Sequence, residues 1–437
     1  MGMNLDSKLL ARNFVHSSVS LSNKVVVTPT LSFSKHHYYV IEKRQQTASA
    51  SLLFARHMKT KERVVIKILR DCKVTRYSLV TSEERLLYQL EALHWNNKFA
   101  PRIYMGVARI LGWSYDPRSI VISEIIENPT KENIDSKGEY ALVMHELPMD
   151  RRLDILLNKG DEISLQNNLR ILTEYVAYMH TELVEPPIPI DHNIIWGSFE
   201  QLQKKLEHNL ALIDQLLRTN DNSQDWASKE SRYIFKHLHL LNLHHRNLPK
   251  QVIVSEEQKE TLITLRSNLR KILRQNPYQG YLEKRIQQQR IKRCHGDLKA
   301  PHIWITPYNY ISDTEPWEYV RVIDAIDFNP SYCNIDILSD LAMLVLDIQA
   351  RTKSSVHTSR FIENYLRLTE QEDEISRAVL AFYLIEKAIM WTAVSIVYDD
   401  LPDLGLAFLD IANNRMADVD TLYEIPQLSA QTSLLLH

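Results

Sequence analysis

Short runs of β-branched and aromatic residues, separated by polar turns, dominate the chain from residue 36 to about residue 150. Such runs are typical of strands. They predict strands at 38–41, 51–55, 63–69, 103–110, 119–125 and 140–144. In the third run, an alternation with a period of two puts Lys67 on the face opposite Val64, Ile66 and Ile68. Residues 1–35, which are rich in serine and asparagine, are expected to form an N-terminal arm.

One helix is predicted among these strands, after residue 80. Ser82 is expected to cap its N-terminus, with Glu83 and Glu84 in the first turn, where negative charge suits the helix dipole. Leucines recur at helical spacing after this turn and predict the apolar face. They are Leu86, Leu90 and Leu93, with Leu87 widening the face. After the last strand, 146–148 form a connector.

The pattern becomes helical beyond residue 150, where leucine and isoleucine recur three and four positions apart. Helices are predicted at 165–180, 202–217, 262–273, 337–351 and 373–397. A short hairpin is expected within this region, with strands at 303–305 and 319–323 and a turn at 313–316. We therefore expect an α+β chain in two parts. A β-rich part with one main helix occupies 36–148, and a mainly helical part occupies 149–437, with a helical insert at about 190–290 and C-terminal helices at 373–437.

The composition excludes several classes of protein. A chain of 437 residues is too long for a single core, and its 44% hydrophobic and 24% charged residues are ordinary for a globular protein. The 52 basic and 54 acidic residues give a net charge of -2, so charge offers no reason to expect nucleic acid or an anionic membrane as a partner. No apolar run approaches the length of a membrane span, and no signal-peptide pattern is present.

Cysteine usage points to a reducing compartment. The chain has three cysteines, Cys72, Cys294 and Cys333, which form neither a disulfide framework nor a zinc-type pair. We expect Cys294 and Cys333 to be small buried side chains. A cytoplasmic protein is the resulting expectation.

Two acidic motifs carry the strongest chemical signal. The first is His-Gly-Asp-Leu-Lys-Ala-Pro-His at 295–302, which places Asp297 in a turn. The second is Val-Ile-Asp-Ala-Ile-Asp-Phe at 322–328, at the end of the predicted hairpin, and it contains Asp324. Phosphoryl transfer needs one carboxylate near the acceptor hydroxyl and another that holds magnesium against the nucleotide phosphates. Asp297 and Asp324 can supply both from adjacent segments.

Nearby carboxylates have competing interpretations. Asp327 competes with Asp324 for the metal, although we favour Asp324. Asp336 either belongs to the site or caps the helix that begins at residue 337. Asp340 is expected to stabilise the turn around Asp297 rather than to contact substrate.

The run at 295–302 resembles the catalytic loop of the aminoglycoside phosphotransferase and choline kinase-like superfamily. Further segments resemble, in the same order, its bacterial branch of uncharacterised aminoglycoside phosphotransferase family enzymes. They lie at 100–107, 140–148, 178–180, 323–329 and 335–342. The resemblance extends from about residue 36 to residue 351 and thins between 190 and 280. It implies a bilobal protein kinase-like fold, with a small β-rich N-terminal lobe and a large, mostly helical C-terminal lobe.

The resemblance also implies roles for residues around the catalytic loop. Asp297 matches the aspartate that orients or deprotonates the acceptor hydroxyl, and Lys299 matches a lysine that contacts the transferred phosphate in protein kinases. Asp324 matches the metal-binding aspartate. His302 stands where a second metal ligand, usually Asn, is expected, and magnesium prefers oxygen. His302 therefore either binds the metal or packs beside Trp304.

The implied cofactors are ATP and Mg²⁺. Lys67 matches the strand lysine that holds the α- and β-phosphates, and Glu83 matches its partner on the helix, with Glu84 as the alternative. Adenine would lie against the connector at Glu146 and Leu147.

Departures from the family pattern leave other functions open. The loop at 43–51, which should cover the phosphates, has no glycine, although small residues such as Ser49 still allow close approach. This loop and His302 favour a nucleotide-binding pseudokinase or scaffold as an alternative to a small-molecule kinase. Lys299 favours a protein Ser/Thr kinase, but the short stretch between Asp324 and the next helix leaves no room for a long segment that holds a peptide. Sugars, aminoglycoside-like compounds, choline-like alcohols and nucleosides all stay open as acceptors, as does the oligomeric state.

Overall fold

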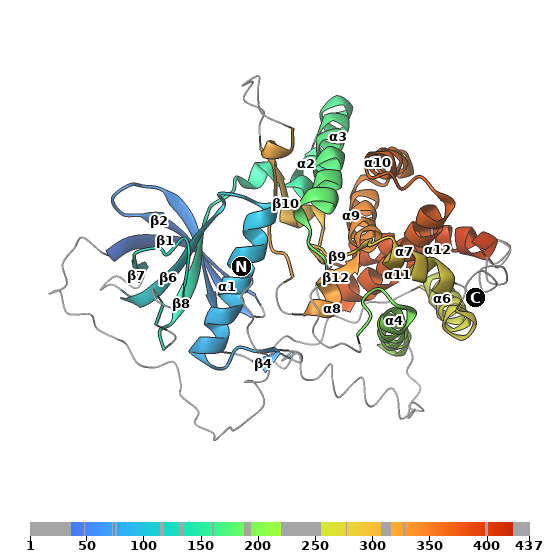
Figure 1. Ribbon diagram of the computed structural model, residues 1–437, viewed down its shortest axis with the longest axis horizontal. Coiled ribbons are helices and arrows are strands. Elements are labelled where there is room, and N and C mark those ends of the chain that lie inside the picture. Colours follow the sequence, from blue (N-terminus) through green and yellow to red (C-terminus); the bar gives the residue numbers. More distant parts are fainter. Residues whose placement is uncertain are drawn as a thin grey trace, which may run out of the picture.

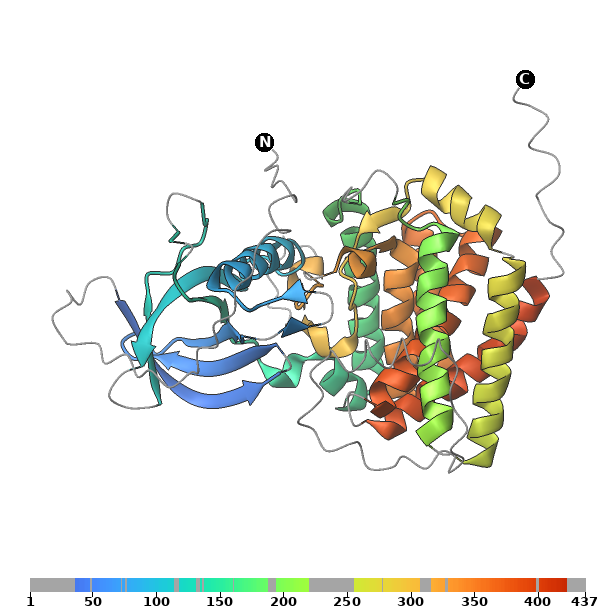
Figure 2. The same ribbon diagram turned by 90° about the horizontal axis from the view of Figure 1, so that it is seen from below.

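The computed structural model places a β barrel and one long helix at one end of the molecule and most of the helices at the other (Figure 1). A view turned by 90° shows the same separation (Figure 2). The structure describes residues 36–422, with gaps at 48, 72, 75–76, 114–117, 131–133, 136, 160, 188–193, 220–254, 277, 307–315, 327–328 and 398–400. The predicted N-terminal arm at 1–35 lies outside the described residues.

Six strands close into a barrel in the order β1-β2-β3-β8-β6-β7. They are β1 (His36–Gln46), β2 (Ala50–His57), β3 (Arg63–Leu69), β6 (Tyr104–Trp113), β7 (Ser119–Ser123) and β8 (Tyr140–His145). The pairing of β1 with β7 closes the sheet, which the strand pattern alone did not predict. A small two-stranded sheet of β4 (Lys73–Val74) and β5 (Tyr77–Ser78) precedes the long helix.

The alternation along β3 places its side chains on two different faces. Val64 and Ile66 are fully buried inside the barrel, with Ile68 packed against the same cluster. Val65 belongs instead to a cluster that includes residues of the long helix. Lys67 shares the face of Val65, because strand side chains alternate. The predicted orientation of Lys67, opposite Val64, Ile66 and Ile68, is therefore confirmed.

The long helix α1 (Ser82–Phe99) begins one residue earlier than expected. Thr81, not Ser82, is its N-cap: the Thr81 hydroxyl accepts from the Glu84 N–H at 3.1 Å, and the Glu84 carboxylate accepts from the Thr81 N–H at 2.9 Å. This reciprocal capping box satisfies two backbone donors at once. Leu87 does not widen the buried face, because 44% of it is exposed. Gln89 is buried instead and donates to the Tyr140 carbonyl at 3.0 Å.

The turn between β1 and β2 is shorter than the loop predicted at 43–51. Both strands extend into that segment, so only 47–49 separate them. The Thr47 N–H donates to the Ala50 carbonyl at 2.8 Å, and the Thr47 hydroxyl accepts from the Ala50 N–H at 3.0 Å. The threonine side chain therefore closes the turn without glycine.

Helices make up most of the chain beyond residue 150. They are α2 (Leu153–Lys159), α3 (Glu162–Tyr178), α4 (Phe199–Thr219), α6 (Glu256–Gln275), α7 (Gln279–Gln287), α8 (Pro330–Cys333), α9 (Ile337–Thr352), α10 (Ser355–Leu368), α11 (Glu374–Val397) and α12 (Pro402–Leu422), with a π turn at Met179–Leu183 after α3. The leucine stripes predicted in α4 and α6 face one core, which also holds α9 and α11. Among the described helices, none has the length and apolarity that crossing a membrane requires.

Short strands inside the helical part flank the two acidic motifs. Strand β10 (Ile303–Ile305) pairs with β11 (Val320–Val322), which confirms the predicted hairpin, while most of its predicted turn at 313–316 lies outside the described residues. Strand β9 (Ile291–Arg293) pairs with β12 (Asn334–Asp336). The segment at 295–302 therefore joins two strands and is anchored at both ends.

A buried ion pair fixes the start of α9. Asp336 caps this helix by accepting from the Leu338 N–H at 2.9 Å, which confirms its predicted capping role. Both Asp336 carboxylate oxygens also accept from the Arg285 guanidinium, at 2.8 and 2.6 Å. The remaining Arg285 nitrogen donates to Gln371 and Ser376. Both partners are fully buried, so removing either one would leave an unpaired buried charge and strongly destabilise the fold.

Replacing Arg285 with methionine should lower the free energy of unfolding by about 3–5 kcal/mol, because it leaves the buried Asp336 carboxylate without its cation. Urea denaturation measures this loss. The matched control is Arg377→Met, which breaks an exposed ion pair with Glu363 and should cost less than about 1 kcal/mol. Equal losses in the two variants would contradict the importance of the buried pair.

Candidate active site

The loop at 295–302 requires glycine at its second position. Gly296 has a φ of +86°, a conformation that side chains with a Cβ rarely adopt. A Cβ there would also lie 2.7 Å from the Tyr332 carbonyl oxygen. The tight turn at Gly296 brings the loop against α8 and against the Ile326 side chain before that helix, and the next residue, Asp297, is partly exposed.

Asp340 on α9 holds this loop through its backbone. One carboxylate oxygen accepts from the His295 N–H at 3.0 Å, and the other accepts from the Gly296 N–H at 2.9 Å. His180, in the π turn that follows α3, lies 3.3 Å from the same carboxylate and contacts the Tyr365 hydroxyl at 2.7 Å with its other ring nitrogen. The predicted structural role of Asp340 is confirmed.

The charge of Asp340 is retained in spite of its burial. Burial by itself would raise the pKa of Asp340, but the hydrogen bond and charge of His180, together with the Gly296 N–H, outweigh it and lower that pKa. A carboxylate, and not a neutral acid, therefore accepts both backbone donors. Such charge-assisted hydrogen bonds are about twice as strong as neutral ones.

His295 connects the loop to the segment that carries Asp324. Its Nδ1 accepts from the Asp297 N–H at 3.3 Å, so Nε2 carries the proton and donates to the Ile323 carbonyl at 3.0 Å. The His295 carbonyl accepts from the Ile326 N–H at 2.9 Å. Burial lowers the pKa of His295 to about 4, which keeps the ring neutral. The segments that carry Asp297 and Asp324 are thus tied together.

Asp297 lies between two basic side chains. Its carboxylate is 3.0 Å from the Lys299 ammonium and 3.5 Å from His302 Nδ1, and 24% of the side chain is exposed. Burial by itself would raise the pKa of Asp297. The charges of Lys299 and His302 lower this pKa by a larger amount, so the net shift is downward. Asp297 is therefore an ionised acceptor at neutral pH, as a hydroxyl-orienting group must be.

Asp324 is held in a strained backbone conformation that exposes its carboxylate. Its φ is +64°, which is uncommon for a residue with a Cβ, and 57% of its side chain is exposed. The Asp324 N–H points to the Tyr104 hydroxyl at 3.4 Å, and the next N–H, of Ala325, donates to Asn96 on α1 at 3.0 Å. Strain of this kind concentrates at functional sites.

Lys67 and His302 bring the two carboxylates into one cluster. The Lys67 ammonium lies 3.4 Å from one Asp324 oxygen, and His302 Nε2 lies 3.7 Å from the other. Because Nδ1 of the same imidazole faces Asp297, one ring lies between both acids. Burial raises the pKa of Asp324, but Lys67 and His302 lower it by more, so the carboxylate stays ionised. The structure therefore brings Asp297, Asp324 and Lys67 together.

The donor set around Asp324 suits a divalent cation. His302 Nδ1 is 3.0 Å from the Asp297 carbonyl oxygen, which can only accept, so Nδ1 carries the proton in the neutral ring. The lone pair of Nε2 then faces the exposed Asp324 carboxylate. One carboxylate and one imidazole fit Mg²⁺ or Mn²⁺ as a partial ligand set, which leaves positions for phosphate oxygens and water. Asp327, the competing acid, lies outside the described residues.

The other predicted nucleotide contacts lie around the barrel. The backbone carbonyl of Ser49, in the β1–β2 turn, accepts from the Arg70 N–H at 2.8 Å. Ser49 therefore lies near the end of β3 that carries Lys67. The connector at 146–148 follows β8, where Glu146 accepts from Arg63 at 2.9 Å and Leu147 is half-buried. Their roles toward a nucleotide stay predictions.

Glu83 and Glu84 occupy different environments in the first turn of α1. Within the described part of the chain, no ion pair joins Glu83 to Lys67, and Glu83 is exposed. Glu84 takes part in the N-terminal capping box. Lys67 pairs with Asp324. Pairing of Lys67 with either glutamate stays a prediction.

Several residues of the site escaped the sequence analysis. Asn96 and Tyr104 position the backbone around Asp324, and His180 supports Asp340. The Arg293 guanidinium, buried before the catalytic loop, lies 4.3 Å from the centre of the Trp95 ring on α1. Asn96 carried one available signal, because an asparagine in the last turn of a helix often forms hydrogen bonds to backbone groups.

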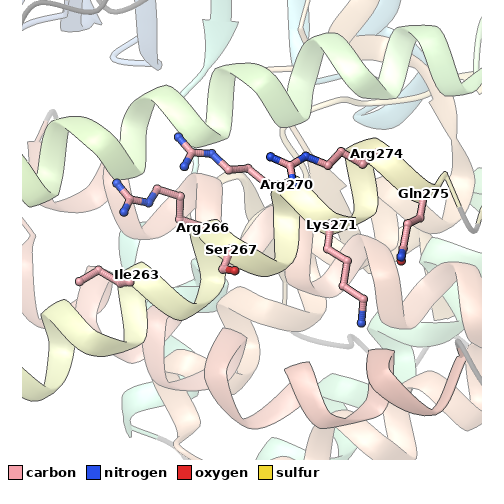
Figure 3. A pocket seen from close by; sticks show the side chains of 7 residues that line it. All are labelled: Ile263, Arg266, Ser267, Arg270, Lys271, Arg274 and Gln275. Carbon is pink, nitrogen blue, oxygen red and sulfur yellow. The ribbon is translucent and has the colours of Figure 1, made fainter.

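A hollow of about 490 Å³ on α6 is not part of this cluster. Figure 3 shows the guanidinium groups of Arg266, Arg270 and Arg274 in a row along that helix. Arg266 pairs with Asp214 on α4 at 3.1 Å. None of the described residues that line the hollow is acidic. It therefore offers neither of the carboxylates that phosphoryl transfer requires, and the helix lies at the far end from the barrel (Figure 1).

The lowered pKa of His295 predicts an acid-sensitive fold. Below pH 6.5 the unfolded chain binds a proton at this histidine that the folded chain does not bind until about pH 4. Stability should therefore fall by about 3 kcal/mol between these pH values because of this group. Urea unfolding of wild type and His295→Gln at pH 7, 5 and 4 measures how steeply the free energy of unfolding of each protein depends on pH. If the free energy of unfolding of His295→Gln depends on pH as steeply as that of wild type, the assignment is contradicted.

Comparison with known proteins adds structural neighbours. No protein family matches the chain by its sequence profile, and no curated protein matches it in sequence. Among solved structures, an ethanolamine kinase of Plasmodium vivax aligns over 90% of this chain and 83% of its own, with 13% identity and a TM-score of 0.37. A mutant aminoglycoside 2'-phosphotransferase IIIa in complex with GDP aligns over 86% and 92%, with 10% identity and a TM-score of 0.40. The ADP-bound aminoglycoside phosphotransferase APH(2'')-Ib aligns over 86% and 94%, with 12% identity and a TM-score of 0.36.

Proposed function

We propose that the protein is an ATP-dependent phosphotransferase that moves the γ-phosphate onto a hydroxyl group of a small molecule. The observation that carries this proposal is one cluster of side chains. In it, His302 lies between Asp297 and Asp324, and Lys67 contacts the other carboxylate oxygen of Asp324. Two ionised carboxylates beside a lysine are the groups that this reaction requires. The barrel and the helical part would form the two lobes of a kinase-like fold, with ATP between them.

Each residue of the cluster has a separate task in this reaction. Asp297 accepts the hydrogen bond of the acceptor hydroxyl, orients its oxygen toward the γ-phosphorus and takes its proton. The oxygen forms a bond to that phosphorus, the bond to the bridging oxygen breaks, and ADP leaves with the electron pair. Lys67 would bind the phosphates that remain on ADP, and Lys299 would stabilise the charge on the transferred group.

The metal site fits the same arrangement. Asp324 and His302 would hold Mg²⁺, which neutralises phosphate charge when bound. The Lys67 ammonium supplies positive charge to Asp324. The exposed position of Asp324 leaves its carboxylate accessible to a metal that arrives with ATP.

A small-molecule acceptor fits the chain better than a peptide. Between Asp324 and Asp336 the backbone is used by α8 and by β12, which pairs directly with β9. A protein kinase needs a long segment here to hold its peptide substrate. The described residues leave little length for one, so the protein Ser/Thr kinase is the weaker candidate.

A pseudokinase is the second candidate, and His302 is the observation that favours it, because magnesium prefers oxygen ligands. The ordered contacts of Asp297 and the retained Lys67–Asp324 pair favour catalysis instead. Purified protein that binds ATP and Mg²⁺ but forms no ADP with any acceptor pool would establish the pseudokinase.

Asp297→Asn should reduce turnover by about 10²–10⁴-fold, because the amide cannot take the hydroxyl proton. Binding of ATP should be nearly unchanged, since Asp297 is assigned to the acceptor. The measurement is ADP formation with a metabolite extract, combined with mass spectrometry for products that gain one phosphate. Asp403→Asn, an exposed aspartate on α12, is the control and should match wild type. A fully active Asp297→Asn variant would rule out the proposed role.

His302→Asn should retain turnover and shift the metal preference toward Mg²⁺ by roughly tenfold relative to Mn²⁺, because an amide oxygen replaces the imidazole nitrogen. Rates with each metal at several concentrations measure this ratio. His302→Phe keeps a ring but no ligand atom, and it should require much more of either metal. If both variants show the metal dependence of wild type, His302 is not a ligand.

A further inference from the structure

The catalytic loop meets α11 at a tryptophan. The Lys299 ammonium lies 4.5 Å from the centre of the Trp391 ring. Lys299 also contacts Asp297, so Trp391 marks the side of the site where the acceptor hydroxyl would enter. Lys387 and Ser395 lie one turn before and one turn after Trp391, and residues four apart share one face of a helix.

This face of α11 carries polar atoms that lack partners. The indole N–H of Trp391 and the hydroxyl of Ser395 are buried, and neither has a hydrogen-bond partner in the described part of the chain. Buried donors are normally satisfied, and leaving one unpaired costs about 1–3 kcal/mol. The indole nitrogen can only donate. A bound molecule with acceptor oxygens would remove this cost.

Two lysines extend the same face toward α4. The Lys387 ammonium lies 3.2 Å from Glu386, whose carboxylate also accepts from Asn209 on α4 at 3.3 Å. Lys205 lies one turn before Asn209, on the same face of α4, and no described acidic group forms an ion pair with it. Burial and the charge of Lys387 lower the pKa of Lys205 to about 8. Two lysines against one glutamate leave one positive charge in excess.

We propose that the acceptor molecule carries an acidic group, a carboxylate or a phosphate, which Lys205 and Lys387 bind while the hydroxyl group lies at Asp297. This inference rests on the proposed phosphotransfer and names the substrate class. The Trp391 ring would cover the portion of the molecule between its acidic group and its hydroxyl, with the indole N–H donating to an acceptor oxygen.

The hydrogen-bonding groups at this face exclude a cationic substrate molecule. Lysine and tryptophan side chains only donate, and Glu386, the carboxylate that the described residues place at this face, is already engaged by Asn209 and Lys387. An ammonium group would be repelled by the excess positive charge of Lys205 and would find no hydrogen-bond acceptor. An anion would gain charge-assisted hydrogen bonds instead.

The test uses the full chain with ATP, MgCl₂ and a metabolite extract divided by ion exchange into anionic, neutral and cationic fractions. Mass spectrometry should find a product with one added phosphate from the anionic fraction. Treating that fraction beforehand with a phosphatase, which is then removed, separates phosphate esters from carboxylates. Product from only the neutral or the cationic fraction would overturn the inference and leave the proposed function standing.

Lys205→Met should raise KM for the anionic acceptor by about 10- to 100-fold, the equivalent of one charged hydrogen bond, and leave KM for ATP unchanged. The variant should unfold at the same or a higher urea concentration, because it removes a partly buried unpaired charge. This separates a binding role from a structural one. Lys205→Arg should keep most of the affinity. Lys204→Met, at an exposed neighbour that pairs with Glu200, should match wild type.

If no fraction yields product, phosphotransfer fails, and binding decides the inference. The anionic fraction should then still raise the melting temperature of wild type but not of Lys205→Met. Equal responses of the two proteins, or no response of either, would overturn the acidic-ligand site.

Discussion

The hydrogen bonds of Asp340 to the backbone of the loop at 295–302 are the constraint on which the candidate site depends. Two adjacent N–H groups, of His295 and Gly296, donate to one buried carboxylate, and this pairing sets the path of the chain just before Asp297. Because α9 is buried on nearly every side, its position is fixed by the core, and the loop inherits that rigidity. Catalysis by positioning needs such support, since an error of about 1 Å in the placement of a reacting group can cost two orders of magnitude in rate.

Alternating charge organises the side chains that this loop presents. Lys299, Asp297, His302, Asp324 and Lys67 follow one another in space, and each acid lies between two basic groups. The acids therefore stay ionised, and the cations are placed where phosphate oxygens would replace the carboxylates as partners. Beyond Lys299 the polarity changes, because α11 and α4 offer donors and an excess positive charge. Nucleotide and acceptor would thus meet different electrostatic surroundings.

Local sequence patterns determined much of this architecture. The period-two alternation in β3 fixed the face of Lys67, because a strand has only two faces. The leucine stripes of α4 and α6 identified core helices, and Asp336 capped α9 as expected. Local patterns failed where one residue decides a boundary: Thr81 rather than Ser82 caps α1, because only the threonine forms a capping box with Glu84. The turn between β1 and β2 was also shorter than its composition suggested.

The sequence named Asp297 and Asp324 as candidates from their two acidic motifs, and its resemblance to a family added Lys67 and His302. Only the tertiary structure decided that His302 lies between the two acids and that Lys67 pairs with Asp324. Lys67 and Asp324 are more than two hundred residues apart in the chain, so no local pattern could predict their contact. Closure of the barrel, the support of Asp324 by Asn96 and the approach of Trp391 to Lys299 likewise depend on packing between distant elements. Periodicity reports which face of an element is buried, and it contains no information about which other element covers that face.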